Sequence, residues 1–251
     1  MTVVNPISDL SIRPRLDALR PLAHPRALAI ASVLALCAAV GFGLLVARTP
    51  SWSASELGID QWLSLHHSPF LDSVALTIAW LFNPTQATVI TLLSATLIGL
   101  VTRNPARVLT FLGMIAVAWG GCEVIKWLVQ RPRPDATLLA HPLLVEHSFS
   151  YPSGHTCFVA ALGIALVFVA RDHPGRPIVI TAATLATVLV AASRVYLGVH
   201  YPADVVASVV YSIAASALSL IVWLPYVLPR MPAGWRREPA SHRRGQQQQS
   251  S

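Results

Sequence analysis

The chain has 251 residues, of which 54% are hydrophobic and 12% are charged, and its formal net charge is +7. Soluble globular domains carry about twice this share of charged residues, so the composition excludes an ordinary soluble fold and indicates a membrane protein. The positive charge does not predict a nucleic-acid partner, because the arginines are scattered in short segments without a binding motif or interleaved aromatic residues.

Apolar runs long enough to cross a ~30 Å hydrocarbon layer as helices follow one another along the chain. They cover residues 27–47, 85–102, 107–129, 155–170, 177–193 and 203–226. A shorter apolar stretch at 69–82 contains Asp72 and is expected to form an interfacial or re-entrant helix before the second span. The sequence therefore predicts an all-α, polytopic membrane helical bundle with six transmembrane helices plus a short interfacial helix.

The basic residues predict how these spans are oriented, because loops that stay in the cytoplasm retain an excess of Lys and Arg. With the N-terminus inside, most of the 18 basic residues fall on the inner side. We therefore expect a cytoplasmic N-terminal segment at 1–26, one transmembrane domain at 27–226, and a cytoplasmic, disordered tail at 227–251. The outer loops are then 48–68, 130–154 and 194–202, and their shortness favours a bacterial inner membrane.

The first polar cluster ends the third predicted span and contains Lys126, Arg131 and Arg133. Lys126 is the only lysine of the chain, and Glu123, one turn earlier, is expected to pair with it. The cations can be anchors at the membrane surface, with Trp127 at the headgroup level. They can also form an anion site, because guanidinium groups bind phosphate oxygens in pairs and an ammonium supplies a compact point charge.

The second cluster is YPSGH, residues 151–155, directly before the fourth span. Pro152, Ser153 and Gly154 are typical of a helix start, so the motif can be a simple capping turn. A helix start also offers free main-chain N–H groups and the positive end of the helix dipole to a phosphate, which Gly154 would allow to approach closely. His155 enters the span, where a titratable side chain is a functional candidate.

The third cluster is SRVYLGVHYPAD, residues 193–204, between the fifth and sixth spans. Pro202 predicts the first turn of the sixth span, with His200 just before it and Asp204 just inside it. A carboxylate that fixes one imidazole tautomer leaves the other ring nitrogen free as a base or nucleophile. The alternative is that Asp204 only stabilises the helix N-terminus and that His200 only lies at the interface.

In the six-span topology all three clusters lie on the outer face. They would bring together two histidines, one with a carboxylate partner, and at least three cations, which are the groups that displacement at phosphorus requires. The outer-loop carboxylates Asp135 and Glu146 do not have the spacing of a two-metal centre, so no metal is expected.

These residues resemble the three-part signature of the type 2 phosphatidic acid phosphatase superfamily: Lys126 and, after six residues, Arg133–Pro134; Pro152–Ser153–Gly154–His155; and Ser193–Arg194 with His200 and Asp204. The resemblance covers about residues 55–226. It implies an integral membrane, metal-independent hydrolase without a cofactor, acting at the outer leaflet on a lipid phosphate or pyrophosphate. Phosphatidic acid, phosphatidylglycerol phosphate and undecaprenyl pyrophosphate are all compatible substrates, and the oligomeric state is open.

The resemblance also implies a role for each residue of the signature. His200 would attack phosphorus and form a phosphohistidine, Asp204 would orient it, and His155 would protonate the leaving oxygen. The phosphate oxygens would be held by Lys126, Arg133, Ser153, Gly154 and Arg194, whereas Arg131 and Glu123 are possible secondary members of the site.

Other functions compete with hydrolysis as explanations of the signature. A phosphohistidine can be captured by a lipid or sugar alcohol instead of water, and the sequence does not separate this phosphotransferase from a phosphatase. A vanadate-dependent haloperoxidase is disfavoured, because the relatives with that activity are soluble. A non-enzymatic transport or interaction bundle is disfavoured, because both histidines of the signature are present.

Overall fold

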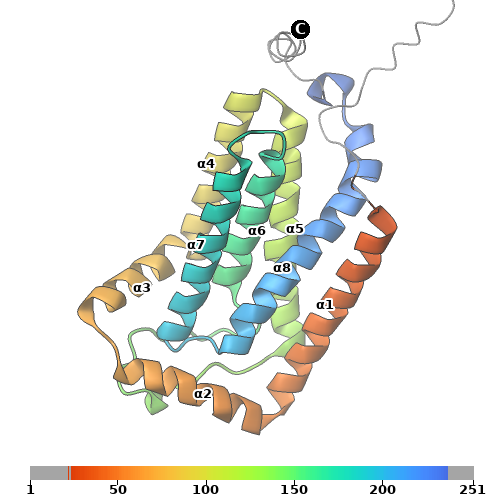
Figure 1. The fold of residues 1–251 in the computed structure, drawn as a ribbon. Helices are drawn as coiled ribbons and strands as arrows, with labels where there is room; N and C mark the ends of the chain where they lie inside the picture. Colours follow the sequence, from red (N-terminus) through yellow and green to blue (C-terminus); the bar gives the residue numbers. More distant parts are fainter. Residues whose placement is uncertain (1–21, 23, 237–251) are drawn as a thin grey trace, which may run out of the picture.

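The computed structural model describes residue 22 and residues 24–236, and this part of the chain contains eight α-helices (Figure 1). They are α1 Pro25–Arg48, α2 Pro50–Leu65, α3 Pro69–Leu81, α4 Pro84–Thr102, α5 Pro105–Val129, α6 Gly154–Val169, α7 Arg176–Tyr196 and α8 Pro202–Val222. Six of the eight begin with proline at the first helical position, where its missing N–H costs no helical hydrogen bond. Proline thus marks most of the helix starts.

Five of the described helices are long and apolar enough to cross a membrane: α1, α4, α5, α7 and the continuous helical segment from Pro202 to Arg230 that begins with α8. The predicted span at 155–170 corresponds to α6, which has 16 residues and a length of about 24 Å, shorter than a ~30 Å hydrocarbon layer. The expected helix at 69–82 is confirmed as α3. The all-helical membrane fold is thus confirmed, and the count of six spans stays a prediction.

The central position in the bundle belongs to α6, which packs against α5, α7 and α8. Its buried residues include Cys157, Ala160, Ala161 and Gly163, all small. A Cβ at Gly163 would lie 2.7 Å from the Cβ of Ala183 on α7, so only glycine fits this helix crossing. Small residues allow close approach of helices where hydrophobic burial cannot drive association. This packing fixes the position of the α6 N-terminus, where the PSGH motif begins.

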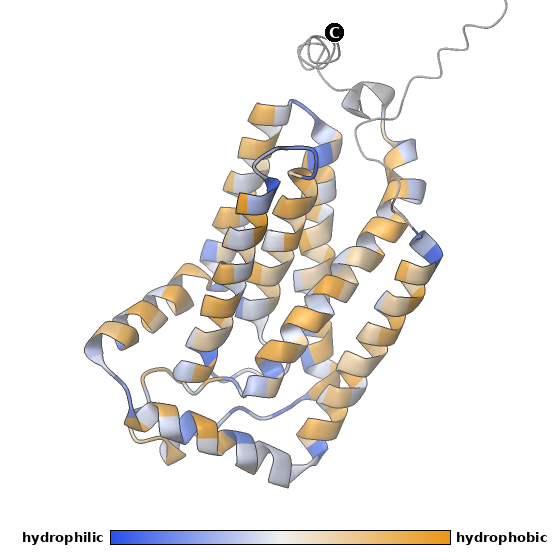
Figure 2. Ribbon diagram, in the orientation of Figure 1, coloured by the Kyte–Doolittle hydropathy of each residue, from blue (hydrophilic) through white to orange (hydrophobic). Residues whose placement is uncertain are grey.

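The outer faces of the bundle are apolar, whereas hydrophilic residues gather toward its ends (Figure 2). Many large apolar side chains on α4 and α7 are exposed, including Leu93, Leu97, Leu100, Ile178 and Leu189. Exposed apolar surface on this scale is typical of a protein that faces lipid. The protein is therefore an integral membrane protein.

The segment 48–68, expected as a loop, instead contains α2, which lies across one end of the bundle (Figure 1). Its polarity is the reverse of a soluble amphipathic helix, because Asp60 and Ser64 are buried while Ile59 and Trp62 are exposed. A helix at a membrane surface can turn its apolar face to lipid and its acids toward the protein. The expectation of a loop was wrong because Glu56 and Asp60 interrupt the apolar run that a sequence pattern detects.

Residues 1–21, 23 and 237–251 lie outside the described part of the chain, and with them most of the predicted N-terminal segment 1–26 and of the tail 227–251. The described residues after 222 continue as a π-helical turn, Trp223–Val227, and two 3-10 turns, Leu228–Arg230 and Ala233–Arg236. The first ten residues of the predicted disordered tail are thus largely helical turns.

Candidate active site

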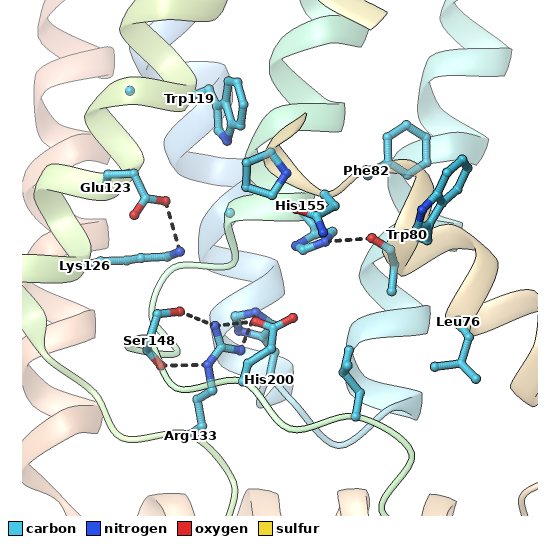
Figure 3. A pocket seen from close by; sticks show the side chains of 17 residues that line it. Leu76, Trp80, Phe82, Trp119, Glu123, Lys126, Arg133, Ser148, His155 and His200 are labelled. Carbon is cyan, nitrogen blue, oxygen red and sulfur yellow. Dashed lines mark hydrogen bonds and ion pairs between the residues drawn. The ribbon is translucent and has the colours of Figure 1, made fainter. Parts of the chain in front are cut away.

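The three polar clusters of the sequence lie at the same end of the bundle, the end that α2 crosses (Figure 1). There α5 and α7 end, and α6 and α8 begin. A cavity of about 780 Å³ opens between them, with polar residues from four segments in its wall (Figure 3). These residues are Glu123, Lys126, Arg133, Glu146, Ser148, Gly154, His155 and His200, with Asn83 of the turn after α3 as a further polar neighbour. Residues far apart in sequence therefore share one pocket, and both histidines of the signature line it.

The rest of the cavity wall is apolar and comes mainly from α3 and the turn that follows it. Leu76, Trp80 and Phe82 lie on one side, and Trp119 of α5 lies above the histidines (Figure 3). Ala79 of α3 also lines the cavity. Ligand pockets commonly combine such an apolar wall with a few convergent polar groups. The cavity can therefore accept a molecule with an apolar part and an anionic end.

Lys126 forms the ion pair with Glu123 that the sequence predicts, with 3.0 Å between Nζ and Oε1. The Lys126 side chain is largely buried, whereas half of the Glu123 side chain is exposed in the cavity wall. A Cβ at Gly154 would lie 3.2 Å from Lys126 Nζ, so the start of α6 comes close to the ammonium because position 154 is glycine. Lys126 and the α6 N-terminus thus present positive charge to the same place.

Arg133 makes hydrogen bonds with all parts of its guanidinium group. Nε donates to the Ser148 carbonyl at 2.7 Å, and Nη2 donates to Ser148 Oγ at 2.8 Å. Nη2 also forms an ion pair with Glu146, with 2.7 Å between Nη2 and Oε2. Nη1 donates to the Val199 carbonyl at 2.6 Å and lies 3.0 Å from His200 Nε2. Arg133 therefore contacts the imidazole and the loop that precedes PSGH at the same time.

His200 is buried, and Gly198, with φ +64°, provides the left-handed turn that brings it back from the end of α7. Its Nδ1 lies 3.6 Å from Asp204 Oδ2, which is close but longer than a hydrogen bond. Burial first, and then the positive charges of Arg133 and Arg194, hold the pKa of His200 well below its usual value. The imidazole is therefore neutral, with Nε2 as a hydrogen-bond acceptor toward Arg133.

Asp204 has a structural role as well as its place beside His200. Its Oδ2 accepts a hydrogen bond of 2.9 Å from the main-chain N–H of Tyr201, which caps α8. Its Oδ1 accepts one of 2.7 Å from Arg131 Nη1. The sequence left two roles open for Asp204, a cap of α8 and a partner of His200. The cap is present as a hydrogen bond, and the carboxylate also lies close to the His200 ring.

Arg131 is fully buried and does not line the cavity. Besides Asp204, it contacts Glu56 Oε2 at 2.6 Å and Ser53 Oγ at 3.0 Å on α2, and its guanidinium lies 4.0 Å from the centre of the Tyr201 ring. The side chain therefore points away from the cavity. Arg131 was expected as a secondary member of the site, and it contacts the site only through Asp204. Glu56 completes the connection by accepting the Ala203 N–H at 2.7 Å.

Asp60 of α2 is a buried carboxyl group beside this ion-pair network, and neither of its oxygens has a hydrogen-bond partner among the described residues. Burial, reinforced by the negative charges of Asp204 and Glu56, raises its pKa to about 8. The folded protein thus retains a proton that the unfolded chain releases near pH 3.8. Stability contributed by this group is present below the unfolded pKa and decreases as pH rises toward the folded value.

We expect Asp60→Asn to remove this pH dependence, because an amide needs no proton to stay neutral. Thermal unfolding in detergent would show a midpoint that falls between about pH 4 and about pH 8 in the wild type and falls less in the variant. Asp135→Asn is the matched control, since Asp135 is exposed. An equal slope in Asp60→Asn and wild type would contradict a protonated Asp60.

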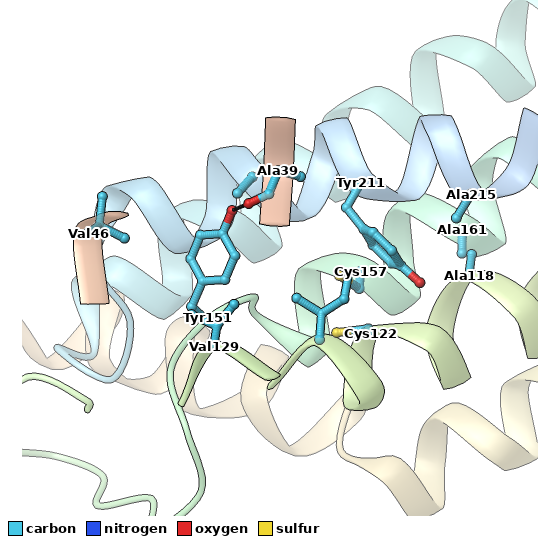
Figure 4. Close-up of a cluster of buried hydrophobic side chains, with 12 residues drawn as sticks. Ala39, Val46, Ala118, Cys122, Val129, Tyr151, Cys157, Ala161, Tyr211 and Ala215 are labelled. Atoms are coloured by element: carbon cyan, nitrogen blue, oxygen red, sulfur yellow. Dashed lines mark hydrogen bonds between the residues drawn. The ribbon is translucent and has the colours of Figure 1, made fainter. Parts of the chain in front are cut away.

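Hydrogen bonds on the side away from the cavity fix the position of the PSGH motif and of Tyr151 before it. Ser153 is buried and does not line the cavity; its Oγ accepts from the Thr156 N–H and caps α6, and its N–H donates to Ser208 Oγ at 2.8 Å. Tyr151 lies in the hydrophobic core between α1 and α5, where its hydroxyl donates to the Ala39 carbonyl (Figure 4). Of the expected phosphate ligands in this motif, Gly154 lines the cavity and Ser153 supports it.

His155 lies across the cavity from Lys126 (Figure 3). Its Nε2 is 3.1 Å from the carbonyl of Ala79 in the last turn of α3. A carbonyl can only accept, so Nε2 carries a proton and the ring orientation is set by α3. The sequence contained no signal for this contact, because the last carbonyls of a helix have no helical partner and can bind any nearby donor.

Arg194 is fully buried at the end of α7, and its Nη2 donates to Glu146 Oε1. Its Nε and Nη1 have no hydrogen-bond partner in the described part of the chain. Burial alone would raise the pKa of Glu146, but the charges of Arg194 and Arg133 lower it, so the carboxylate is ionised. Glu146 therefore bridges the two arginines of the signature, a contact that the sequence analysis missed.

Within the described residues, no group of three or more His, Cys, Asp or Glu side chains is arranged to hold a metal ion. The positive charge in and around the cavity comes from Lys126, Arg133 and Arg194 and from the α6 N-terminus. Such groups can stabilise negative charge that develops on phosphate oxygens.

The fold and the cavity define a class of protein: a helical integral membrane protein with a cation-lined, histidine-containing pocket at one end of its bundle. The sequence model of the PAP2 superfamily matches residues 107–227, which include every signature residue. Undecaprenyl-diphosphatase BcrC of Bacillus subtilis is 33% identical over 153 residues, which are 59% of this chain and 72% of that protein. The chain belongs to the PAP2 superfamily.

Other similar proteins are also phosphatases by name. Phosphatidylglycerophosphatase B of Bacillus subtilis is 38% identical over 88 residues, 33% of this chain and 41% of that protein. An undecaprenyl-diphosphatase of Sulfolobus acidocaldarius is 34% identical over 110 residues, 42% of this chain and 49% of that protein. The match thus spans less than half the length of these two relatives.

A solved structure confirms the fold. The crystal structure of a transmembrane PAP2-type phosphatidylglycerolphosphate phosphatase from Bacillus subtilis superimposes with a TM-score of 0.63. The superposition covers 83% of this chain and 98% of that one, at 23% sequence identity. The two chains therefore share one helical architecture over most of their length.

Proposed function

We propose that the protein is an integral membrane phosphatase that hydrolyses a lipid phosphate or pyrophosphate through a phosphohistidine on His200. The observation that carries the proposal is the neutral, buried imidazole of His200, whose Nε2 lies 3.0 Å from Arg133 Nη1 in a cavity that Lys126 and His155 also line. A neutral imidazole has the lone pair that attack on phosphorus needs. The names of the relatives, which include lipid phosphate and diphosphate phosphatases, support the reaction class.

In the first step His200 Nε2 attacks phosphorus and the bond from phosphorus to the lipid oxygen breaks. The electron pair of that bond goes to the leaving oxygen, which takes a proton from His155, so the product is a lipid alcohol or a lipid monophosphate. Lys126, Arg133, Arg194 and the Gly154 amide would bind the non-bridging oxygens as their charge changes.

In the second step a water molecule replaces the lipid. His155 accepts a proton from the water, whose oxygen attacks phosphorus while the phosphorus–nitrogen bond breaks and its electron pair returns to His200. Inorganic phosphate is released. Asp204, 3.6 Å from Nδ1, stabilises the positive imidazole ring during both steps, and no step requires a metal ion.

The apolar wall of the cavity supports a lipid as the substrate. Trp80, Phe82 and Trp119 would contact the first carbons of an acyl or prenyl chain, whereas the phosphate reaches the cations at the other side (Figure 3). The excess of arginine in the predicted inner loops supports an active site at the outer leaflet, with both termini in the cytoplasm. The short outer loops favour a bacterial inner membrane.

Release of inorganic phosphate by the full chain purified in detergent tests this proposal. Phosphatidic acid, phosphatidylglycerol phosphate and undecaprenyl pyrophosphate are the three substrates to compare, each with and without a metal chelator. We expect release from at least one of them, unchanged by the chelator. No release from any of the three, or release that the chelator abolishes, would contradict the proposal.

A further inference from the structure

The two arginines proposed to bind phosphate, Arg133 in the cavity wall and Arg194 buried behind it, already contact an anion that belongs to the chain itself. Glu146 places Oε2 at 2.7 Å from Arg133 Nη2, and its Oε1 contacts Arg194 Nη2. The carboxylate is ionised, because the two guanidinium groups lower its pKa. A carboxylate between two guanidinium groups makes the same kind of contact that a phosphate would make there.

Every nitrogen of the Arg133 guanidinium group already has a partner in this arrangement. Nε and Nη2 donate to Ser148, Nη1 donates to the Val199 carbonyl and contacts His200 Nε2, and Nη2 also forms the ion pair with Glu146. The contact with His200 also occupies the nitrogen that would attack phosphorus. Arg194, in contrast, keeps Nε and Nη1 buried without a partner among the described residues. The site is thus only partly ready to receive phosphate.

The segment that carries Glu146 is a loop that is attached to the core on either side of an exposed stretch. Leu143 and Leu144 pack against a buried apolar cluster that includes Ala79 and Leu197. Between Leu139 and Ser150, both buried, the chain forms no helix, and Val145, His147 and Ser148 are exposed. Ser150 fixes the far end of this segment through hydrogen bonds with the carbonyls of Arg131 and Pro132. A displacement of Glu146 therefore needs movement only of the surface stretch 145–148, which is tethered on both sides.

We propose that Glu146 is a specificity-determining residue, which competes with the substrate for Arg133 and Arg194 and admits only phosphate groups that carry two negative charges. The proposal rests on the proposed function. A terminal phosphate presents three oxygens and up to two charges, so it binds the two arginines more strongly than a carboxylate does. A phosphodiester carries one charge on two free oxygens, as the carboxylate does, and Glu146 is already tethered at the site. The diester lipids that surround the cavity are thereby excluded.

Binding of two probes to the full chain in detergent tests the competition by calorimetry: inorganic phosphate at mildly alkaline pH, and dimethyl phosphate as a phosphodiester. We expect Glu146→Gln to bind phosphate at least about tenfold more tightly than the wild type and to bind dimethyl phosphate, which the wild type rejects. Glu146→Asp keeps the charge but is one methylene shorter and cannot bridge both arginines. It is expected to change both affinities in the same direction as the glutamine variant.

Glu123→Gln is the matched control for the loss of a negative charge in the cavity. Glu123 takes only one of the three donors of Lys126, so its removal frees little binding capacity, and dimethyl phosphate should still be rejected. Weaker phosphate binding by Glu146→Gln would overturn the proposal and show that Glu146 orients the arginines. Unchanged binding, or equal effects of Glu146→Gln and Glu123→Gln, would also overturn it.

Hydrogen exchange in the wild type tests the same displacement without any substitution. Saturating phosphate should accelerate exchange in residues 139–150, because the loop loses its contacts with the arginines. Slower exchange would contradict the proposal. Lipid hydrolysis measured on the same preparations separates the two claims: absence of hydrolysis in the wild type rejects the proposed function, whereas hydrolysis without any change in probe binding by Glu146→Gln rejects only the role of Glu146.

Discussion

Replacing His200 with alanine is expected to lower kcat for phosphate release by at least about 10³-fold, because the variant has no group that can form the covalent intermediate. The side chain is buried in the cavity wall, and its Nε2 contacts Arg133 and no other side chain by hydrogen bond among the described residues. The loss should therefore appear in the chemical step, with a smaller change in KM. Phosphate release from a detergent-solubilised lipid phosphate at saturating concentration measures it.

His66→Ala is the matched control, since His66 is exposed at the end of α2 and does not line the cavity. It should keep the wild-type rate. The thermal midpoint of His200→Ala should be compared with that of the wild type, so that loss of folding is not taken for loss of the nucleophile. A folded His200→Ala variant that keeps more than about a tenth of the wild-type kcat would contradict the role of His200.

Replacing Arg131 with methionine is expected to give the largest loss of stability, about 3–5 kcal/mol in the free energy of unfolding. The change leaves Asp204 and Glu56 without their shared cation in a buried position, next to Asp60. Activity should fall as well, because Asp204 loses the hydrogen bond that fixes its carboxylate beside His200. The thermal midpoint in detergent and kcat should therefore decrease together.

Two controls separate the buried ion pairs from a general effect of charge. Arg176→Met removes an exposed arginine at the other end of the bundle and should leave the midpoint nearly unchanged. Arg131→Lys keeps the charge but cannot contact both carboxylates with a planar fork, so it should recover only part of the stability. A midpoint of Arg131→Met equal to that of Arg176→Met would show that Arg131 does not stabilise the site.

Most of the features that could be predicted follow from one physical fact, which is that polar groups are costly inside a membrane. Apolar runs of sufficient length fixed the positions of the helices, and the polar clusters between them were conspicuous for that reason. The ion pair of Glu123 with Lys126 was predictable because residues three apart lie on the same helix face. Local periodicity was enough in each of these cases.

The parts that could not be predicted depend on contacts between distant segments. Nothing in the sequence near Arg131 indicates that it binds Glu56, 75 residues away, and so turns from the cavity. The contact of Glu146 with Arg194 likewise joins a loop and a helix 48 residues apart. Helix α2 was missed for a different reason, because Glu56 and Asp60 interrupt the apolar run by which a membrane helix is detected.

The central claim is that phosphorus is transferred to His200 and then to water. Acid-free quenching of the full chain during turnover of a lipid phosphate labelled in its terminal phosphate, followed by peptide mapping, tests it most directly. The account predicts label on the imidazole of His200, more of it when His155 is replaced and hydrolysis of the intermediate is slowed, and none in His200→Ala. Continued phosphate release with no labelled histidine, or label on a different residue, would contradict it.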